Sequence, residues 1–324
     1  MGKVVSTTVT FGKYTDIAIK KLKKAGHTVL LNNEERYYTE NELVALGNKH
    51  QDTEALIVGG DHITRKVIDA FPNLKIIAMH GVGVDKIDIS YASNRKIVVT
   101  NTPGANSIDV AEYVISLMID INRQLFLGIR DMKNGIWQKR VGRRVYGQML
   151  GIIGVGSIGL ELAKRAQAMG LDILGYDPYE NEQAKKYGVS YVNCDDLLSN
   201  ADIIALHAPV IKNAPPIINA DSIKLVKKDA VIINAARAPL VDLDAVEDAI
   251  KQNLIGGFIT DVYEVEPPKE RDLWKHENVL MTPHGGGGTI QANINMGEMA
   301  VANVINILNG ESPINPVNQF FTKK

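Results

Sequence analysis

The stretch Met149-Leu150-Gly151-Ile152-Ile153-Gly154-Val155-Gly156-Ser157-Ile158-Gly159 decides the fold of this chain. Its first half is a short apolar run, typical of a strand buried on both faces of a parallel sheet. Its second half is a G-x-G-x-x-G turn, and residues 160–169 then follow the apolar spacing of a helix. Gly154 allows the tight turn, Gly156 lets a diphosphate approach the backbone, and Gly159 permits close helix packing. The free N–H groups that begin such a helix bind the diphosphate.

An acidic residue after the next predicted strand indicates which dinucleotide binds. Asp177 follows the apolar run 172–176, about 18 residues beyond the third glycine, where a ribose-binding acid is expected. A carboxylate at this position repels a 2′-phosphate, and neither Pro178 nor Tyr179 supplies a cation. A glycine-rich turn of another α/β protein is the alternative, but it would lack this strand–turn–helix context. The sequence therefore predicts NAD rather than NADP.

Short apolar runs alternate with helical patterns along the whole chain. The runs are rich in Val and Ile, and long helical patterns occupy about 107–124 and 290–308. This alternation predicts an α/β fold with doubly wound parallel sheets. The first run includes Val4 and Val5, and the others lie at 28–31, 55–58, 74–79, 97–100, 149–154, 172–176, 202–206, 230–234 and 255–260.

Composition excludes several classes of function. A length of 324 residues predicts roughly two domains. The 36 Lys+Arg against 37 Asp+Glu leave a net charge of −1, which argues against nucleic-acid and membrane-surface partners. One Cys cannot form an internal disulfide, and the histidines show no metal spacing. No apolar run approaches the ~20 residues that cross a bilayer. We therefore expect a cytoplasmic protein without a metal site.

Ionisable side chains follow three of the later predicted strands. Arg237 comes just after the run 230–234. Asp261 and Glu266 come after the next run, and His284 comes after a third strand. Because the carboxyl ends of parallel strands form the ligand-binding edge of a sheet, we expect these four side chains to converge.

This set of side chains suits the reduction of a 2-oxo acid. Arginine binds planar oxygen pairs through a fork of N–H donors, so Arg237 can hold the substrate carboxylate. Hydride transfer to the carbonyl carbon builds charge on its oxygen, and protonated His284 can donate the proton that neutralises it. Glu266 would stabilise that imidazolium. Each residue alone is equally typical of a surface ion pair, but their convergence beside a dinucleotide motif favours a dehydrogenase.

Seven motifs in order resemble those of the D-isomer-specific 2-hydroxyacid dehydrogenases, and within them the phosphoglycerate dehydrogenase-like branch. The resemblance covers nearly the whole chain and implies two doubly wound parallel-sheet domains. A Rossmann nucleotide domain at 102–290 would be inserted into a flavodoxin-like substrate domain made of residues 1–101 and 291–324. The motifs are His80-Gly81-Val82-Gly83-Val84-Asp85, Asn101-Thr102-Pro103-Gly104, the Gly154 turn with Asp177, Leu206-His207-Ala208-Pro209, Asn234 to Arg237, Asp261 to Pro267 and Thr282-Pro283-His284.

The resemblance also implies roles for individual residues. Arg237 would bind the substrate, Glu266 would pair with the catalytic histidine, and His284 would donate and accept the proton. Asp261 would hold the nicotinamide carboxamide. The substrate-binding residues it implies are His80, Val82, Gly83 and Arg237, and the NAD-binding residues are Gly154, Gly156, Ser157, Ile158, Gly159, Asp177, His207, Pro209, Ala235, Ala236, Asp261 and Gly286.

The family is typically homodimeric, and this implies a second copy of the chain as a partner. The two subunits would join through helices of the nucleotide domain at 107–137, with Trp137 a candidate contact to the other subunit. The small-molecule partner would be a 2-oxo or 2-hydroxy acid.

Three departures from the family pattern bear on the site. Ala238 and Pro239 follow the arginine, where the family often has glycines. Gly285 begins a run of four glycines, which adds backbone freedom after the histidine. Phosphoglycerate dehydrogenases commonly bind phosphate through arginines after the third strand, whereas residues 58–62 here contain none. In that stretch we expect Asp61 to repel phosphate.

Three functions therefore remain open from the sequence. The leading one is an NAD-dependent D-2-hydroxyacid dehydrogenase. A D-3-phosphoglycerate dehydrogenase of serine biosynthesis is the first alternative. An NAD-sensing, corepressor-like binding protein is the second, since such proteins can keep Arg237, Glu266 and His284.

Overall fold

The computed structural model describes residues 2–318, so residue 1 and residues 319–324 of the expected C-terminal segment lie outside the described part. The chain divides into two compact units. The discontinuous unit holds the residues up to Asn106 together with those from Gly288 on, and the inserted unit is Ser107–Gly287. The expected junctions, at 101/102 and 290/291, fall a few residues from these boundaries. Each unit contains one all-parallel sheet between helices, which confirms the predicted α/β fold.

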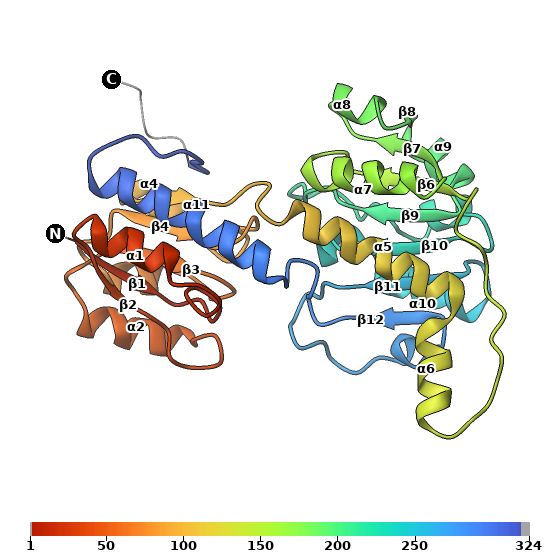
Figure 1. Ribbon diagram of the computed structural model, residues 1–324, viewed down its shortest axis with the longest axis horizontal. Coiled ribbons are helices and arrows are strands. Elements are labelled where there is room, and N and C mark those ends of the chain that lie inside the picture. The colour runs from red at the N-terminus through yellow and green to blue at the C-terminus, as the bar shows by residue number, and fades with distance from the viewer. Residues whose placement is uncertain (1, 319–324) are drawn as a thin grey trace. The chain divides into compact units, whose positions relative to one another are not determined.

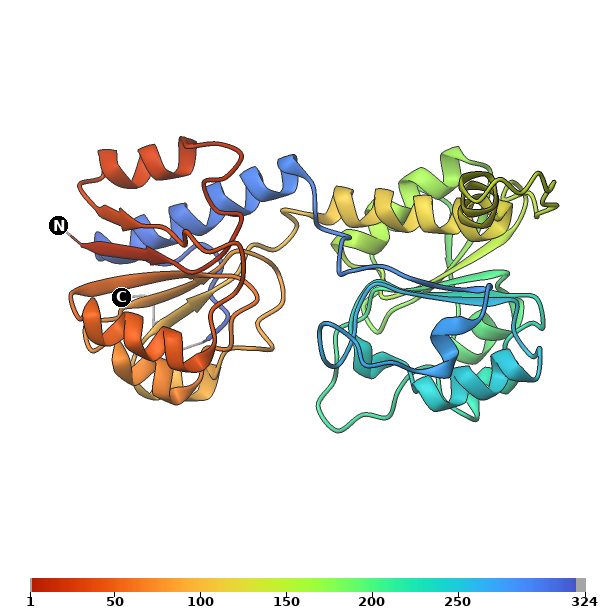
Figure 2. The same ribbon diagram turned by 90° about the horizontal axis from the view of Figure 1, so that it is seen from below.

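The discontinuous unit is a five-stranded sheet in the order β2-β1-β3-β4-β5. Helices α1 and α11 cover one face and helices α2, α3 and α4 cover the other, as Figure 2 shows. The strands are β1 (Lys3–Ser6), β2 (Thr28–Leu30), β3 (Thr53–Val58), β4 (Ile76–Met79) and β5 (Val98–Thr100), and the helices are α1 (Ile17–Lys24), α2 (Glu40–Lys49), α3 (Arg65–Ala70), α4 (Ile89–Asn94) and α11 (Ile290–Leu308).

Strand alternation builds two cores in this unit. In β3, Ala55 and Ile57 pack under α1 and α11, whereas Leu56 and Val58 pack under α2 and α3. Successive side chains of a strand point to opposite faces, so apolar residues at every position fill both layers. Helix α2 begins with a capping box in which the Thr39 side chain and Glu42 bond each other's backbone N–H groups.

The inserted unit is a seven-stranded sheet in the order β12-β11-β10-β9-β6-β7-β8 (Figure 1). Its strands are β6 (Met149–Ile153), β7 (Asp172–Tyr176), β8 (Val189–Tyr191), β9 (Ile203–Leu206), β10 (Val231–Asn234), β11 (Gly257–Thr260) and β12 (Val279–Met281). Its helices are α5 (Ser107–Arg123), α6 (Leu125–Lys133), α7 (Ser157–Ala168), α8 (Glu182–Lys185), α9 (Cys194–Asn200) and α10 (Leu243–Lys251), with short 3₁₀ turns η1 (Ser222–Leu225), η2 (Ala238–Leu240) and η3 (Asp272–Lys275).

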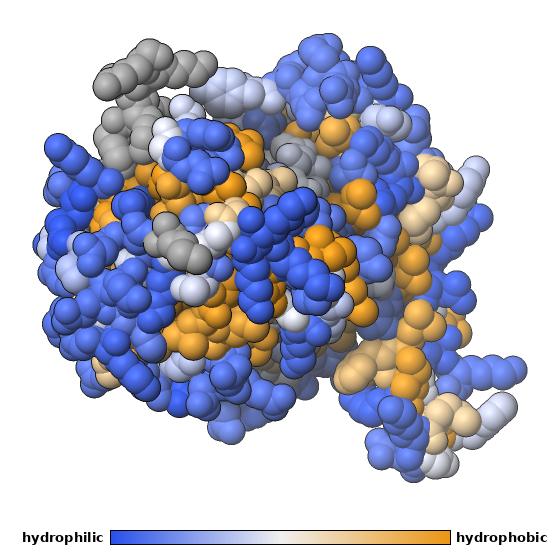
Figure 3. Space-filling model, turned by 60° about the vertical axis from the view of Figure 1, so that its left-hand side comes forward, coloured by the Kyte–Doolittle hydropathy of each residue, from blue (hydrophilic) through white to orange (hydrophobic). Residues whose placement is uncertain are grey.

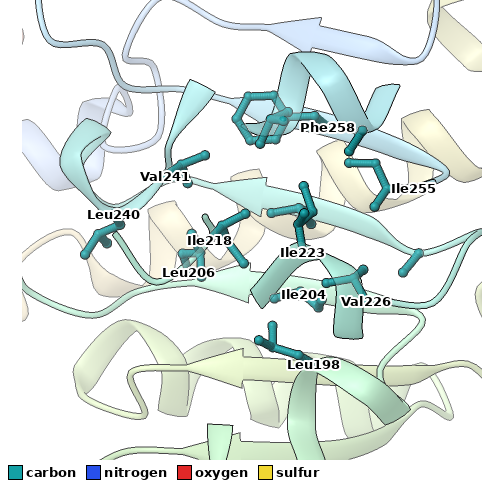
Figure 4. Close-up of a cluster of buried hydrophobic side chains, with 14 of the residues drawn as sticks. Leu198, Ile204, Leu206, Ile218, Ile223, Val226, Leu240, Val241, Ile255 and Phe258 are labelled. Carbon is teal, nitrogen blue, oxygen red and sulfur yellow. The ribbon is translucent and has the colours of Figure 1, made fainter. Parts of the chain in front are cut away.

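Helices cover both faces of this second sheet. Helices α5 and α7 cover one face, where Ile203 and Ala205 of β9 are buried. The opposite face carries Ile204 and Leu206 together with α9, α10 and η1, and Figure 4 shows this cluster around Phe258. Burial on both sides explains why the strands read as continuous apolar runs.

The strand order reverses once in each sheet, and these reversals predict where ligands bind. In the inserted unit the reversal lies between β6 and β9, and in the discontinuous unit between β1 and β3. Ligands of open α/β sheets bind outside the carboxyl ends of the strands at such switch points. Among residues 2–318, no helix combines the length and apolar character needed to span a membrane.

Candidate active site

The glycine turn after β6 has the geometry that its sequence predicted. Gly154 has φ +94°, and a Cβ on it would lie 2.5 Å from the backbone nitrogen of Ala208. The loop after β9 is held against this turn because the N–H of His207 donates to the carbonyl oxygen of Ile153 at 2.7 Å. Only glycine combines this φ with so close an approach of two loops.

The other two glycines of the turn have different surroundings. A Cβ on Gly159 would lie 2.4 Å from the carbonyl oxygen of Gly154, so this glycine lets α7 pack on the turn. A Cβ on Gly156 would meet no atom within 4 Å. Open space therefore lies beside the first turn of α7, where backbone N–H groups face outward. The turn can accept a diphosphate there.

Asp177, at the end of β7, is bonded to the same turn. Its Oδ2 accepts a hydrogen bond from the N–H of Val155 at 2.8 Å, and its Oδ1 accepts one from the N–H of Tyr179 at 2.9 Å. These bonds fix the carboxylate beside the glycine turn and leave lone pairs for ribose hydroxyls. The residues present therefore fit the adenosine half of NAD.

His207 lies at the β6/β9 switch point, next to this turn. Both nitrogens of its ring are buried and have no hydrogen-bond partner among the described residues. Burial lowers the pKa of His207 to about 4, so the ring is neutral at pH 7. Orphaned ring nitrogens are costly, and a bound ligand that donates to this ring would satisfy one of them.

His284 and Glu266 come together from two different loops. Nδ1 of His284 lies 2.7 Å from Oε1 of Glu266. His284 has φ +51°, an uncommon conformation for a residue with a side chain. The imidazole is half exposed, and Glu266 occupies Nδ1, so Nε2 is the nitrogen that can exchange a proton with a substrate.

Asp261 ties the His284 loop to the end of β11. The carboxylate is buried, and its Oδ1 accepts bonds from Thr282 Oγ1 at 2.7 Å and from the N–H of Gly285 at 2.8 Å. Its Oδ2 accepts a bond from the N–H of Gly286 at 2.9 Å. The first two of the four glycines are thus bonded in place, which differs from the expected gain in backbone freedom. The expected bond from Asp261 to the nicotinamide stays a prediction.

Two tyrosines near this loop were missed by the sequence analysis. The hydroxyl of Tyr263 donates to the carbonyl oxygen of Thr282 at 2.9 Å, and burial together with the charge of Asp261 raises its pKa to about 12. A Cβ on Gly285 would lie 2.9 Å from the hydroxyl of Tyr113 on α5. Tyr263 stands inside a motif that pointed to the site, whereas nothing in the sequence linked Tyr113 to Gly285.

Arg237 stands at the end of β10, next to the strand that precedes Asp261. The side chain of Asn234 shapes this turn, because it donates to the carbonyl oxygen of Arg237 at 2.9 Å and accepts from the N–H of Ala236 at 3.1 Å. Nη1 of Arg237 donates to the carbonyl oxygen of Ala236 at 2.7 Å. Strands β10, β11 and β12 are neighbours, so the structure brings Arg237, Asp261, Glu266 and His284 to one sheet edge.

The expected substrate-binding residues other than Arg237 are His80, Val82 and Gly83, and they lie in the discontinuous unit, after β4. His80 is only 6% exposed, and its Nε2 lies 3.2 Å from the carbonyl oxygen of Asn293 on α11. Burial lowers the pKa of His80 to about 4, so this ring is neutral. Val82 is partly exposed, and its carbonyl oxygen accepts a bond from the side chain of Asn101 at 2.8 Å. His80 therefore anchors the loop that carries Val82 and Gly83.

The arrangement also bears on metals. Residues 2–318 contain no group of three or more His, Cys, Asp or Glu side chains placed to hold a metal ion.

Comparisons with known proteins agree with this geometry. A family model for the D-isomer specific 2-hydroxyacid dehydrogenase NAD-binding domain matches residues 115–286. The chain is 38% identical over 306 residues to D-3-phosphoglycerate dehydrogenase of Methanocaldococcus jannaschii, covering 93% of this chain and 57% of that protein. It is 37% identical to hydroxypyruvate reductase of Thermotoga maritima, covering 85% of this chain and 92% of that one. NAD+-bound 3-phosphoglycerate dehydrogenase of Entamoeba histolytica superposes with a TM-score of 0.84 at 28% identity, covering 99% of each chain.

The chain therefore belongs to the D-isomer-specific 2-hydroxyacid dehydrogenase family, and most of its inserted unit is the NAD-binding domain of that family. This confirms the family and the cofactor that the motifs predicted. The chain spans just over half the length of its phosphoglycerate dehydrogenase relative from M. jannaschii, at 57%.

Proposed function

We propose that this protein is an NAD-dependent dehydrogenase that interconverts a 2-oxo acid and a D-2-hydroxy acid. The observation that carries the proposal is the His284–Glu266 pair, which stands at the same sheet edge as Arg237 in an NAD-binding domain. The cofactor supplies the hydride when bound. The residues that would hold NAD are those expected from the sequence, from the Gly154 turn and Asp177 to Gly286, with Asp261 positioning the last of these through its bonds to Gly285 and Gly286.

Three side chains would bind the substrate and transfer its proton: Arg237, His284 and Glu266. The guanidinium of Arg237 binds the carboxylate and carbonyl oxygens and orients the reacting carbon. During reduction, Nε2 of protonated His284 donates its proton to the carbonyl oxygen, and during oxidation neutral His284 takes the hydroxyl proton. Glu266 stabilises the imidazolium through Nδ1 and fixes the orientation of the ring. The backbone around Val82 and Gly83, with His80 as the anchor of its loop, would hold the substrate carboxylate.

Replacing the proton donor tests this function. We expect His284→Ala to lower kcat for 2-oxo acid reduction about 10²- to 10⁴-fold, the usual contribution of general acid catalysis. NADH binding, followed by the fluorescence of the cofactor, should persist because the Gly154 turn is untouched. Full activity in His284→Ala, or a folded wild type that binds NADH and reduces no 2-oxo acid, would contradict the proposal. The second result would favour the corepressor-like alternative, which a partner pull-down would then examine.

D-3-phosphoglycerate dehydrogenase activity is the second candidate function. It is favoured by the 38% identity to the M. jannaschii protein of that name. A comparable identity, 37%, links the chain to a hydroxypyruvate reductase over more of the relative's length. Substrate competition between 3-phosphohydroxypyruvate and hydroxypyruvate separates the two.

We also propose that the protein is a cytoplasmic homodimer joined through residues 107–137. Apolar side chains along this stretch are about half exposed or more, and Figure 3 shows hydrophobic residues among hydrophilic ones on the segment at its lower right, where α6 lies. The buried carboxylate of Asp131 accepts two bonds from Arg140, which holds the following loop on α6. The exposed apolar residues are Ile108, Leu125, Phe126, Ile129, Met132, Ile136 and Trp137, the last 82% exposed.

The oligomeric state tests this surface. We expect sedimentation velocity to report a dimer for the wild type and a monomer for Ile129→Asp, because a buried unpaired charge opposes association. Leu225→Asp is the matched control, since Leu225 is exposed on the opposite face of the same unit. A dimer in Ile129→Asp, or a wild-type monomer, would exclude this interface.

A further inference from the structure

The discontinuous unit has its own switch point, between β1 and β3. The loop after β1 lies against β3, since the N–H of Thr7 donates to the carbonyl oxygen of Ile57 at 2.9 Å. Thr8 is buried against Gly59, whose Cβ, if present, would lie 3.0 Å from that of Thr8. The loop after β4, which carries Val82, is the next one along the sheet. A ligand at this edge would meet all three loops.

Asp61 occupies this switch point but does not face a ligand. It is 1% exposed, and its carboxylate accepts bonds from the Thr7 hydroxyl at 2.5 Å and from the N–H of Tyr38 at 3.0 Å. The backbone N–H groups of Gly59 and Asp61 itself also stabilise it. Burial nonetheless raises the pKa of the Asp61 carboxyl. In other proteins the backbone N–H groups of glycine-rich loops can bind phosphate. In this loop the N–H groups of Gly59 and Asp61 are directed at the Asp61 carboxyl instead. This changes the reason given from the sequence, where Asp61 was expected to repel phosphate directly.

The ring of Tyr37 covers the two glycines before Asp61. A Cβ on Gly60 would lie 2.8 Å from the ring, and a Cβ on Gly59 would lie 3.4 Å from it. Tyr37 remains 52% exposed, so the outer face of the ring is accessible. Glycine at both positions is what lets the ring lie flat on the loop, and no cationic side chain fits at either position beneath it. Two cationic side chains bond to backbone here. Nζ of Lys86 donates to the carbonyl oxygen of Gly60 at 3.2 Å, and Nη1 of Arg36, which is paired with Glu42, donates to the carbonyl oxygen of Tyr37 at 3.1 Å.

We propose that Tyr37 is a specificity-determining residue, whose ring forms the wall of the site against the carbon chain that extends from the 2-oxo acid group of the substrate. The site then takes 2-oxo acids with a short uncharged chain rather than a phosphate ester. This inference rests on the proposed dehydrogenase function. An aromatic face favours apolar or hydroxylated carbon, and it carries no positive charge to bind a phosphate dianion.

A matched pair of substrates tests the proposal. Hydroxypyruvate and 3-phosphohydroxypyruvate differ only in the phosphate, so the ratio of their kcat/KM values isolates its effect. We expect the wild type to favour hydroxypyruvate by at least about tenfold. Tyr37→Ala should reduce this ratio several-fold by lowering kcat/KM for hydroxypyruvate, whereas Tyr37→Phe, which keeps the ring, should retain it. Tyr37→Arg should raise turnover of the phosphate ester.

Controls separate specificity from folding and from the two cations at this loop. Thermal melting and NADH binding show whether Tyr37→Ala is folded, and Lys86→Ala and Arg36→Gln should each leave the ratio unchanged. A wild type that favours the phosphate ester, a Tyr37→Ala ratio within twofold of wild type, or an ester activity that disappears in Lys86→Ala or Arg36→Gln would overturn the inference.

A failure of the dehydrogenase function itself gives a different result. If the wild type reduces neither acid, protection from thermal unfolding by each acid still reports binding. Preferential protection by hydroxypyruvate that is lost in Tyr37→Ala would then support the specificity of the wall while removing the proposed reaction. Equal protection, or stronger protection by the ester, would overturn the inference.

Discussion

Nδ1 of His284 lies 2.7 Å from Oε1 of Glu266, although 17 residues and a strand separate the two in the chain. The pair is held by neighbouring loops after β11 and β12, which are tied together by Asp261. A carboxylate in this position stabilises the protonated ring and directs Nε2 away from it.

Neutralising the carboxylate of that pair should slow the reaction. We expect Glu266→Gln to lower kcat for reduction about 10²-fold, because an amide does not balance the charge of the imidazolium that donates the proton. Glu264→Gln is the control, since Glu264 is exposed on the same loop and has no such partner in the described residues. Equal kcat values for Glu266→Gln and the wild type would show that the contact does not influence proton transfer.

The bonds to Asp261 predict that this residue acts mainly by positioning the His284 loop. Asp261→Asn replaces one acceptor by a donor against Thr282 or Gly286, so kcat should fall about 10²-fold. The loss should be the same with NADH and with its 3-acetylpyridine analogue, which lacks the carboxamide N–H groups. Thr282→Val should show a smaller loss of the same kind. A loss confined to NADH would instead assign Asp261 to the carboxamide.

The two glycines of the turn after β6 should respond differently to alanine. Gly154→Ala places a Cβ at φ +94° and 2.5 Å from backbone, so we expect it to destabilise the protein by about 1–3 kcal/mol or more. Gly156→Ala meets open space and should fold normally while weakening NADH binding, because the new methyl group takes the place of the diphosphate. Urea unfolding and NADH titration of both variants measure the difference. Equal stability of the two variants would contradict the close approach at Gly154.

The buried ring of His80 predicts a loss of stability in acid. Its pKa falls from 6.5 to about 4 on folding, so the unfolded chain binds the proton more readily. The stabilising contribution is complete above pH 6.5 and is lost as the pH falls toward 4. Between pH 7 and pH 5 it amounts to about 2 kcal/mol. The free energy of unfolding of His80→Gln should fall by that much less over the same interval, and an equal fall in both proteins would be inconsistent with a neutral buried ring.

Much of the fold was predictable because each signal was local. Helix α11 begins and ends at Ile290 and Leu308, as its apolar spacing predicted, and α5 ends at Arg123, one residue before the end of the predicted pattern. The three-residue strand β8 was missed, because a run this short has no periodicity of its own. Parallel pairing with the preceding strand, β7, makes it a strand, and this pairing is a tertiary contact that the local pattern does not show.

The candidate site, like the fold, was predictable only in part. The glycine turn, Asp177 and the order of Arg237, Glu266 and His284 could be named from spacing, since parallel strands place their carboxyl ends at one edge. The direction of a side chain could not be. Asp61 lies in the loop where phosphate would bind, yet it points into the fold because Thr7 and the N–H of Tyr38 supply its donors.

The sequence by itself determined the class of fold, the family and the cofactor, because strand periodicity and the glycine turn are patterns of consecutive residues. Only the tertiary structure decided what covers the loops at each switch point. Tyr37 lies over Gly60, and Tyr113 lies against Gly285. The spacing of these residues in the sequence does not predict either contact. Such contacts depend on the packing of helices and loops on the sheet, and this packing is settled only when the whole unit folds.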